Sequence, residues 1–150
     1  MSHRPLRFCL VTTFYPPYSF GGDGILVERL AVELVAQGHH VEVVHCGDAY
    51  NSLRSSTAPA RDGYQDHPAI VHHRLESGVG FLSPLLTQQT GRPVFKTRAL
   101  QRILDTSGFD VVHFHNMSLI GLTALRFSRA ITLYTLHEHW LVCPTHVLWR

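Results

Sequence analysis

Apolar residues along the chain follow two repeating patterns. Short, nearly continuous apolar runs, typical of strands buried on both faces of a parallel sheet, occupy residues 7–13, 40–46, 70–75, 109–115 and 131–137. A spacing of three to four residues, typical of helices with one buried face, occupies residues 25–37, 92–107 and 118–128. Because strand and helix alternate, the pattern predicts one α/β domain over residues 1–150, a Rossmann-like, doubly wound parallel sheet.

The helix predicted at residues 92–107 has two distinct faces. Phe95, Ala99, Ile103 and Leu104 are expected on its buried side. Its other side is basic and is either a solvated face or a contact for anionic lipid headgroups, which would make the protein peripheral to a membrane. The basic residues are Arg92, Lys96, Arg98 and Arg102. Residues 47–68 are polar and predict a long loop, and residues 81–91 fit neither pattern.

Composition narrows the class of protein. The formal net charge of +2 is too small to indicate a nucleic-acid partner. Three cysteines without paired spacing argue against a disulfide framework and for a reducing compartment. The first predicted strand begins too early to leave room for a signal peptide, and no apolar run approaches the ~20 residues of a membrane-spanning helix. We therefore expect a cytoplasmic protein.

A glycine-rich corner, Gly21-Gly22-Asp23-Gly24, lies between the first predicted strand and the first predicted helix. Glycine lets backbone N–H groups approach a ligand closely, and the helix directs its free N–H groups and positive dipole end to the same place. Such a corner suits a phosphate, a diphosphate or a carboxylate. Its alternative interpretation is a tight turn that binds nothing.

Histidines follow two other predicted strands. In an open parallel sheet, ligands bind beyond the carboxyl ends of the strands where the strand order reverses, expected here between the first and fourth strands. His113, His115 and Asn116 belong to the fourth strand end, and His137 and Glu138 to the fifth. His115 is the better ligand contact or else a structural histidine, His113 is expected to be structural, and Glu138 is an acid, a base, a hydroxyl acceptor or a surface carboxylate.

A metal site is not expected. His137, His139, Cys143 and His146 are close in sequence, but no Cys-x-x-Cys pair accompanies them. Walker A, G-x-G-x-x-G and G-x-S-x-G motifs are also missing from the sequence. The aromatic, proline-containing segment at residues 14–20 either stacks on a sugar or an apolar acceptor or packs as a rigid lid.

Three stretches, in order, resemble glycosyltransferase family 4. They are TTFYPP at residues 12–17 with Gly21-Gly22 and GHHVEV at residues 38–43, FDVVHFHN at residues 109–116, and TLHEHWLVCP at residues 135–144. Glu138 stands where aspartate is commoner in the family. The resemblance implies the N-terminal, acceptor-side domain of a GT-B enzyme that transfers a sugar from a nucleotide-sugar donor with retention of configuration. The implied acceptor is a glycan, a lipid or a small molecule, and neither a metal nor another cofactor is implied.

The resemblance also implies roles for particular residues. Gly21 and Gly22 would approach the donor diphosphate, and His115 would lie near the transferred sugar with His113 behind it. Tyr18, Asn116, His137 and Glu138 would line the acceptor side. Acceptor choice would depend on the segments at residues 14–20, 47–68 and 81–91.

The donor half of the family pattern is missing from these 150 residues. No two glutamates stand eight positions apart, so the family's E-x7-E motif is not present. The last eleven residues are also crowded with apolar side chains, including Trp140 and Trp149, as expected for a chain cut within a larger fold. We therefore expect the C-terminal domain to be missing and the 150 residues alone to be inactive.

Two other functions fit parts of the sequence. In a dinucleotide-dependent oxidoreductase, the glycine corner would hold the pyrophosphate of NAD and Asp48 would accept the ribose hydroxyls. In a non-enzymatic α/β interaction module, the apolar C-terminal end would be the interface.

Overall fold

A computed structural model describes residues 4–54 and 63–137 of the chain. Over these residues, five parallel strands form one sheet in the order β3-β2-β1-β4-β5. The strands are β1 Arg7–Val11, β2 His40–Cys46, β3 Ile70–Leu75, β4 Val111–Phe114 and β5 Ile131–Tyr134. The order reverses between β1 and β4, as the sequence predicted, so the site expected from the topology lies beyond these two strand ends.

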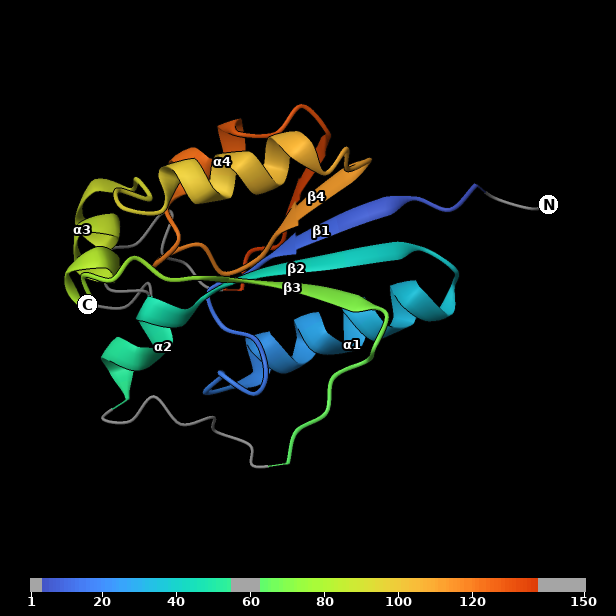
Figure 1. Cartoon of the computed structure of the whole chain (residues 1–150), viewed down its shortest axis with the longest axis horizontal. Coiled ribbons are helices and arrows are strands. Elements are labelled where there is room, and N and C mark those ends of the chain that lie inside the picture. The colour runs from blue at the N-terminus through green and yellow to red at the C-terminus, as the bar shows by residue number, and fades with distance from the viewer. Residues whose placement is uncertain (1–3, 55–62, 138–150) are drawn as a thin grey trace.

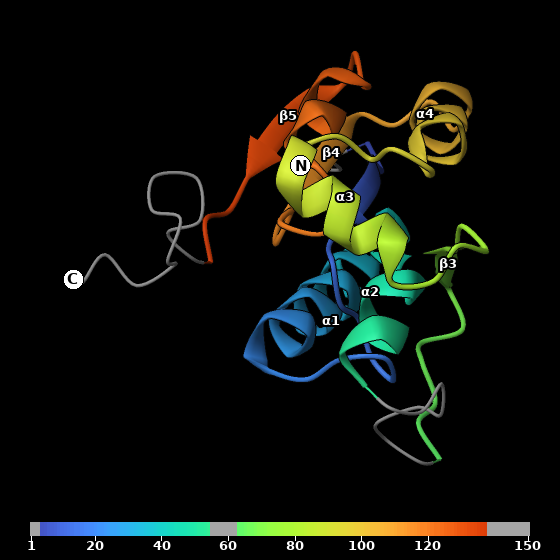
Figure 2. The same ribbon diagram turned by 90° about the vertical axis from the view of Figure 1, so that its left-hand side faces the viewer.

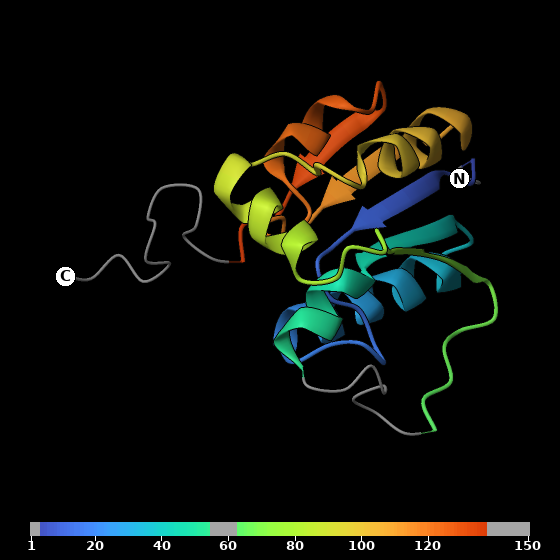
Figure 3. The same cartoon turned by 60° about the vertical axis from the view of Figure 1, so that its left-hand side comes forward.

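Helices cover both faces of the sheet, which confirms the doubly wound α/β fold. Figure 1 shows α1 on one face and α4 on the other, with α2 and α3 beyond the carboxyl ends of the strands. Figures 2 and 3 show α2 and α3 side by side at that edge. The helices are α1 Gly22–Ala36, α2 Gly47–Leu53, α3 Leu82–Thr90, α4 Thr97–Thr106 and a short 3-10 helix, η1, Leu122–Arg126.

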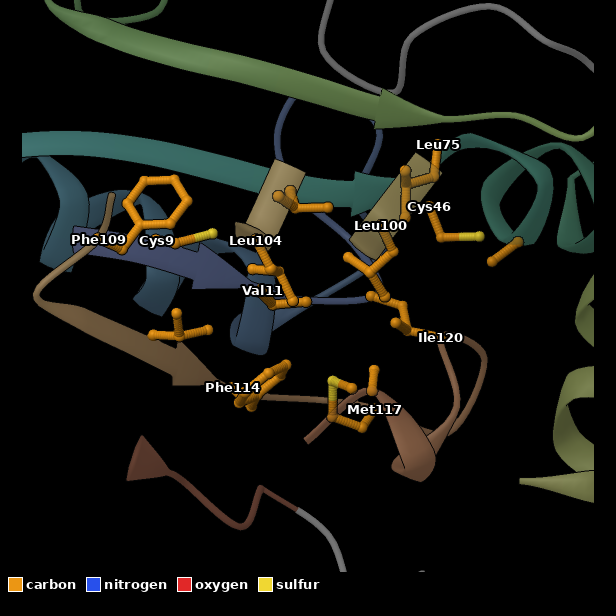
Figure 4. Packing of buried hydrophobic residues seen from close by; sticks show 14 residues of the cluster. Cys9, Val11, Cys46, Leu75, Leu100, Leu104, Phe109, Phe114, Met117 and Ile120 are labelled. Atoms are coloured by element: carbon orange, nitrogen blue, oxygen red, sulfur yellow. The ribbon is translucent and has the colours of Figure 1, made fainter. Parts of the chain in front are cut away.

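Each face of the sheet has its own hydrophobic core, because alternate residues of a strand point to opposite faces. Leu10 of β1 packs with Val27 and Ala31 of α1 on one face. Cys9 and Val11 pack on the other face with α4, η1 and the segment after β4 (Figure 4). Burial of this apolar surface is the main driving force for folding. It also anchors the strand ends that carry the polar residues of the site.

The two helices beyond the strand ends differ from the sequence prediction. Helix α2 lies within residues 47–68, which the sequence predicts to be a loop, and α3 lies within residues 81–91, which fit neither the strand nor the helix pattern. Neither segment has the regular spacing of apolar residues that is typical of an amphipathic helix. Helix α2 forms because Ala49 and Tyr50 are buried against the rest of the fold, and tertiary contacts of this kind commonly decide the structure of short segments.

Helix α4 is shorter than predicted and turns a different face to the core. Leu100 and Leu104 are buried and Ile103 is half-buried, but Ala99 is exposed, and Phe95 is 48% exposed and lies before the helix. The predicted basic face is wrong as a four-residue surface. Lys96 is only 1% exposed and Arg92 precedes the helix, which leaves Arg98 and Arg102 as exposed arginines on α4.

The bounds of two other helices also differ from the sequence prediction. Helix α1 begins three residues before its predicted start, so Gly22 is helical and Gly21 is the N-cap. The helix predicted at residues 118–128 is the five-residue η1.

Within residues 4–54 and 63–137, none of the helices has both the length and the apolar character needed to cross a bilayer.

Gly121, in the segment after β4, packs closely against Arg92 and Pro93, in the segment before α4. Its φ of 105° is unfavourable for any residue with a side chain, and a Cβ here would lie 2.7 Å from the backbone nitrogen of Pro93. We expect Gly121→Ala to lower the free energy of unfolding by about 2 kcal/mol, measured by urea denaturation. Gly21→Ala is the matched control, because Gly21 has an extended φ of −166° and open space around its missing Cβ. Equal unfolding midpoints for the two variants would contradict this expectation.

Candidate functional site

Hydrogen bonds join the chain segments that follow β1 and β4. The backbone N–H of Thr13 donates to the carbonyl oxygen of Asn116 at 2.9 Å, and the Thr13 hydroxyl donates to the same oxygen at 2.8 Å. The Asn116 side-chain amide donates to a carboxylate oxygen of Asp23 at 3.2 Å. The glycine corner and the end of the fourth strand, separated by about ninety residues in the sequence, therefore meet at one place.

The glycine corner is the N-terminus of α1. Gly21 is an extended N-cap residue without a side-chain cap, and both Gly21 and Gly22 are exposed with open space where a Cβ would project. Gly24 differs, because a Cβ there would lie 2.3 Å from the Ser19 hydroxyl oxygen. The first two glycines are therefore open to a ligand, whereas packing against the preceding loop requires the third.

Asp23 turns its carboxylate into the same corner. One carboxylate oxygen accepts the backbone N–H of Gly24 at 2.8 Å and the other accepts the Asn116 amide. A carboxylate is stabilised by the positive end of a helix. Asp23 therefore occupies part of the anion-binding capacity of the helix end, and the backbone of Gly21 and Gly22 is the part left open.

Three histidines lie together at the ends of β4 and β5. The rings of His113 and His115 are 4.1 Å apart between centroids, and those of His115 and His137 are 5.3 Å apart. A ring nitrogen of His113, Nε2, pairs with the Thr135 hydroxyl at 2.8 Å. The Nδ1 of His115 lies 3.0 Å from the Nε2 of His137. His113 thus has a hydrogen-bond partner within the protein, and the rings of both neighbouring histidines lie close to His115.

Burial disfavours the charged forms of His113 and His115. His115 is 1% exposed, and burial lowers its pKa to about 3, with His113 and His137 acting in the same direction. Burial also lowers the pKa of His113, with a further contribution from His137. At neutral pH, His115 is therefore an uncharged imidazole. Its Nε2 atom is buried and has no hydrogen-bond partner in the described part of the chain.

Aromatic side chains of the segment at residues 14–20 pack against β3 and α2. The guanidinium carbon of Arg74 lies 4.0 Å from the centroid of the Tyr18 ring, and Tyr18 packs edge-on against Tyr50 of α2. Phe20 stacks on Tyr50 with centroids 4.9 Å apart. Tyr18, which was expected to contact an acceptor, is therefore half-buried in protein contacts.

Asp48 belongs to a buried network that the sequence did not reveal. Its carboxylate accepts the Ser77 backbone N–H at 3.0 Å and lies 3.5 Å from the Lys96 ammonium, which also donates to the Ser83 hydroxyl at 2.5 Å. This arrangement makes the expected contact between Asp48 and a dinucleotide ribose wrong, because the side chain is only 6% exposed and its carboxylate is already engaged. The spacing of Lys96 with Leu100 and Leu104 was the one signal for its burial.

Within residues 4–54 and 63–137, no group of three or more histidine, cysteine, aspartate or glutamate side chains is arranged to hold a metal ion. His137 instead pairs with His115. Glu138, His139, Cys143 and His146, which were considered as acceptor or metal contacts, lie outside the described residues.

Comparison with protein-family models matches the chain to one family. The profile of the family described as Glycosyltransferase Family 4 matches residues 20–150, which include the glycine corner and all three histidines. A search of curated proteins found no significant match. The profile covers far more than half of the chain, on a Rossmann-like sheet of the predicted topology. The chain therefore belongs to glycosyltransferase family 4.

Proposed function

We propose that this chain forms the acceptor-side half of a GT-B glycosyltransferase, which transfers a sugar from a nucleotide-sugar donor with retention of configuration. One observation carries the proposal. In a chain of this family, the open N-terminus of α1 and the neutral His115 lie at the same topological switch point, joined through Asn116.

The donor diphosphate would lie against the backbone of Gly21 and Gly22. Both residues are exposed, and the N-terminus of α1 stabilises negative charge that grows as the nucleotide leaves. The N–H of Gly24 is less available, because it already donates to Asp23. Under this proposal, no metal or other cofactor is needed to hold the diphosphate at this corner.

The transferred sugar and the acceptor would lie next to His115. Its unpaired Nε2 suits a hydrogen bond with a sugar hydroxyl, since an uncharged imidazole can pair with an uncharged group without the cost of a buried charge. Asn116 and His137 are at the same strand ends and would line the acceptor side. We propose the same for Tyr18 and for Glu138.

A cavity between α2 and α3 supports an apolar part in the acceptor. It has a volume of about 180 Å³ and lies in the segments where acceptor choice was expected. Leu53 and Phe81 on its rim are 63% and 62% exposed. Ligand sites of this kind are concave and mostly apolar. A lipid acceptor, or a glycan or small molecule with an apolar group, fits this lining.

We also propose a cytoplasmic enzyme that contacts a membrane only peripherally, if its acceptor is a lipid. Cys9 and Cys46 are free and buried, which fits a reducing compartment. The donor-binding domain would be supplied by residues outside this chain, so the 150 residues alone are expected to release no nucleotide from any donor.

The test uses the gene product at the length at which it occurs in its native cell. We expect it to release nucleoside diphosphate from at least one of the UDP-, ADP- and GDP-sugars in the presence of a cell extract as the source of acceptor. His115→Ala should lower kcat by about a hundredfold, because a group that contacts the reacting sugar is lost. His40→Ala, an exposed histidine at the opposite end of β2, is the control and should retain activity.

Other outcomes of the same test would favour the alternative functions. Sugar transfer by the 150-residue chain alone would contradict the expectation that these residues lack the donor-binding domain. Binding of NAD without any sugar transfer would favour an oxidoreductase. A stable dimer that binds neither NAD nor a nucleotide-sugar would favour an interaction module.

A further inference from the structure

The tautomer of the neutral His115 ring depends on one hydrogen bond. A neutral imidazole has one N–H donor and one lone-pair acceptor, and the partner of one nitrogen decides which role the other nitrogen has. In His115, Nδ1 lies 3.0 Å from the Nε2 of His137, whereas Nε2 is buried and unpartnered in the described part of the chain. The position of a single proton between these two rings therefore decides what His115 presents to a ligand.

The two possible arrangements leave different atoms unpaired. If the His115 Nδ1 carries the proton, it donates to His137, and only a lone pair on the His115 Nε2 is left without a partner. His137 is partly exposed, so water can accept a hydrogen bond from the N–H of its second ring nitrogen, Nδ1. In the reverse arrangement, the His115 Nε2 would be a buried N–H without an acceptor. Buried N–H groups without acceptors are rare in proteins, and unpaired lone pairs are tolerated more readily.

The surroundings of the pair keep both rings in place. The His115 backbone N–H donates to the carbonyl oxygen of Val11 at 2.8 Å, which fixes the end of β4 against β1. His113 packs against the other side of the cluster and is itself held by the Thr135 hydroxyl. Among residues 4–54 and 63–137, the titratable groups that act on His115 are thus the two other histidines.

We propose that His137 is a positioning residue: its Nε2 accepts a hydrogen bond from the Nδ1–H of His115 and thereby fixes a lone pair on His115 Nε2 for a ligand hydroxyl group. The proposal rests on the proposed function for the identity of that ligand, a sugar. His137 acts through His115 and has no bond to the sugar in this role. His115 then accepts a hydrogen bond, so the site favours a free hydroxyl over a group that has only acceptor atoms.

The direct test is the tautomer of His115, which needs no substrate. In protein labelled with ¹⁵N-histidine at pH 7, a long-range ¹H–¹⁵N correlation spectrum distinguishes the protonated ring nitrogen from the lone-pair nitrogen. We expect His115 to be protonated at Nδ1. His137→Leu should shift it toward the Nε2-protonated form, and His137→Gln, whose side-chain oxygen is an acceptor, should restore the original tautomer. Leu136→Ala, an exposed neighbour, should leave the spectrum unchanged.

A spectrum with His115 protonated at Nε2, or one that does not change in His137→Leu, would overturn the proposal. A kinetic measurement on the native-length enzyme provides a second readout. His137→Leu should lower kcat about tenfold with little change in the KM for the donor, and His137→Gln should recover most of the loss. Tautomer changes as expected in a protein that shows no sugar transfer would support the role of His137 and would count against the proposed function alone.

Discussion

Replacing Asp48 by alanine is expected to lower the free energy of unfolding by about 3–5 kcal/mol, because it leaves a buried ammonium group without its counter-charge. Asp48 and Lys96 have side chains that are only 6% and 1% exposed. The same carboxylate accepts the backbone N–H of Ser77. The variant therefore loses a charge pair and leaves a backbone donor unpaired inside the protein.

The measurement is urea denaturation at pH 7.5, followed by circular dichroism. Arg7→Ala is the matched control, because it breaks an ion pair with Glu42 that has a comparable distance, 3.0 Å, but an arginine side chain that is 46% exposed. Exposed pairs contribute little, so the control should lose about 1 kcal/mol or less.

A double replacement separates the ion pair from the packing. Asp48→Leu combined with Lys96→Met removes both charges and keeps similar side-chain volumes, so it should be more stable than Asp48→Ala. If Asp48→Ala were as stable as the Arg7→Ala control, the ion pair between Asp48 and Lys96 would have to be hydrated or unformed. The network joins α2, α3 and α4 near the proposed acceptor cavity, so its loss should also weaken that edge of the fold.

Acidification from pH 7.5 to pH 5 is expected to destabilise the protein by about 4 kcal/mol through two buried histidines. Burial lowers the pKa of both His45 and His115 from 6.5 to about 3. Nearby His72 and Arg74 add to the effect at His45, and His113 and His137 add to it at His115.

The direction of this effect follows from proton binding. Between pH 6.5 and pH 3, the unfolded chain binds a proton at each histidine and the folded protein does not, so stability falls as the pH falls through this range. Above pH 6.5, both states are uncharged at these positions and the contribution of the two histidines is constant. At pH 5, each histidine accounts for about 2 kcal/mol of the loss.

Urea unfolding at pH 7.5, 6 and 5 measures this dependence. The double variant His45→Asn, His115→Asn should lose most of the slope below pH 6.5, whatever its stability at pH 7.5. Each single variant should lose about half of it. An acid slope in the double variant that equals that of the unchanged protein would contradict the assignment to these two side chains.

The central strands were predictable because most of their side chains are buried on both faces of the sheet. Residues 40–46 and 70–75 form β2 and β3 with the predicted bounds, and the sheet reverses its order where expected. A nearly continuous apolar run has few other stable placements in a soluble α/β domain. Short helices such as α2 were not predictable, because their stability comes from contacts with distant residues and not from local periodicity.

The location of the candidate site was predictable from the sequence, but the hydrogen bonds between its side chains were not. Sequence alone placed the glycine corner and the histidines at one edge, because parallel strands end together and the chain order implies the switch point. It also placed His113 and His115 on the same side of the sheet, since they are two residues apart along one strand. Membership of glycosyltransferase family 4 was likewise apparent from three ordered motifs, and the family profile confirms it.

By itself, then, the sequence determined the fold class, the strand order and the end of the sheet at which ligands are expected, because each follows from local apolar patterns and chain order. Only the tertiary structure decided which polar groups meet. The bonds between Asp23 and Asn116, Asp48 and Lys96, and His115 and His137 join residues 93, 48 and 22 positions apart. Such pairs depend on how helices pack against strands and on the register of the sheet, and no local pattern encodes either.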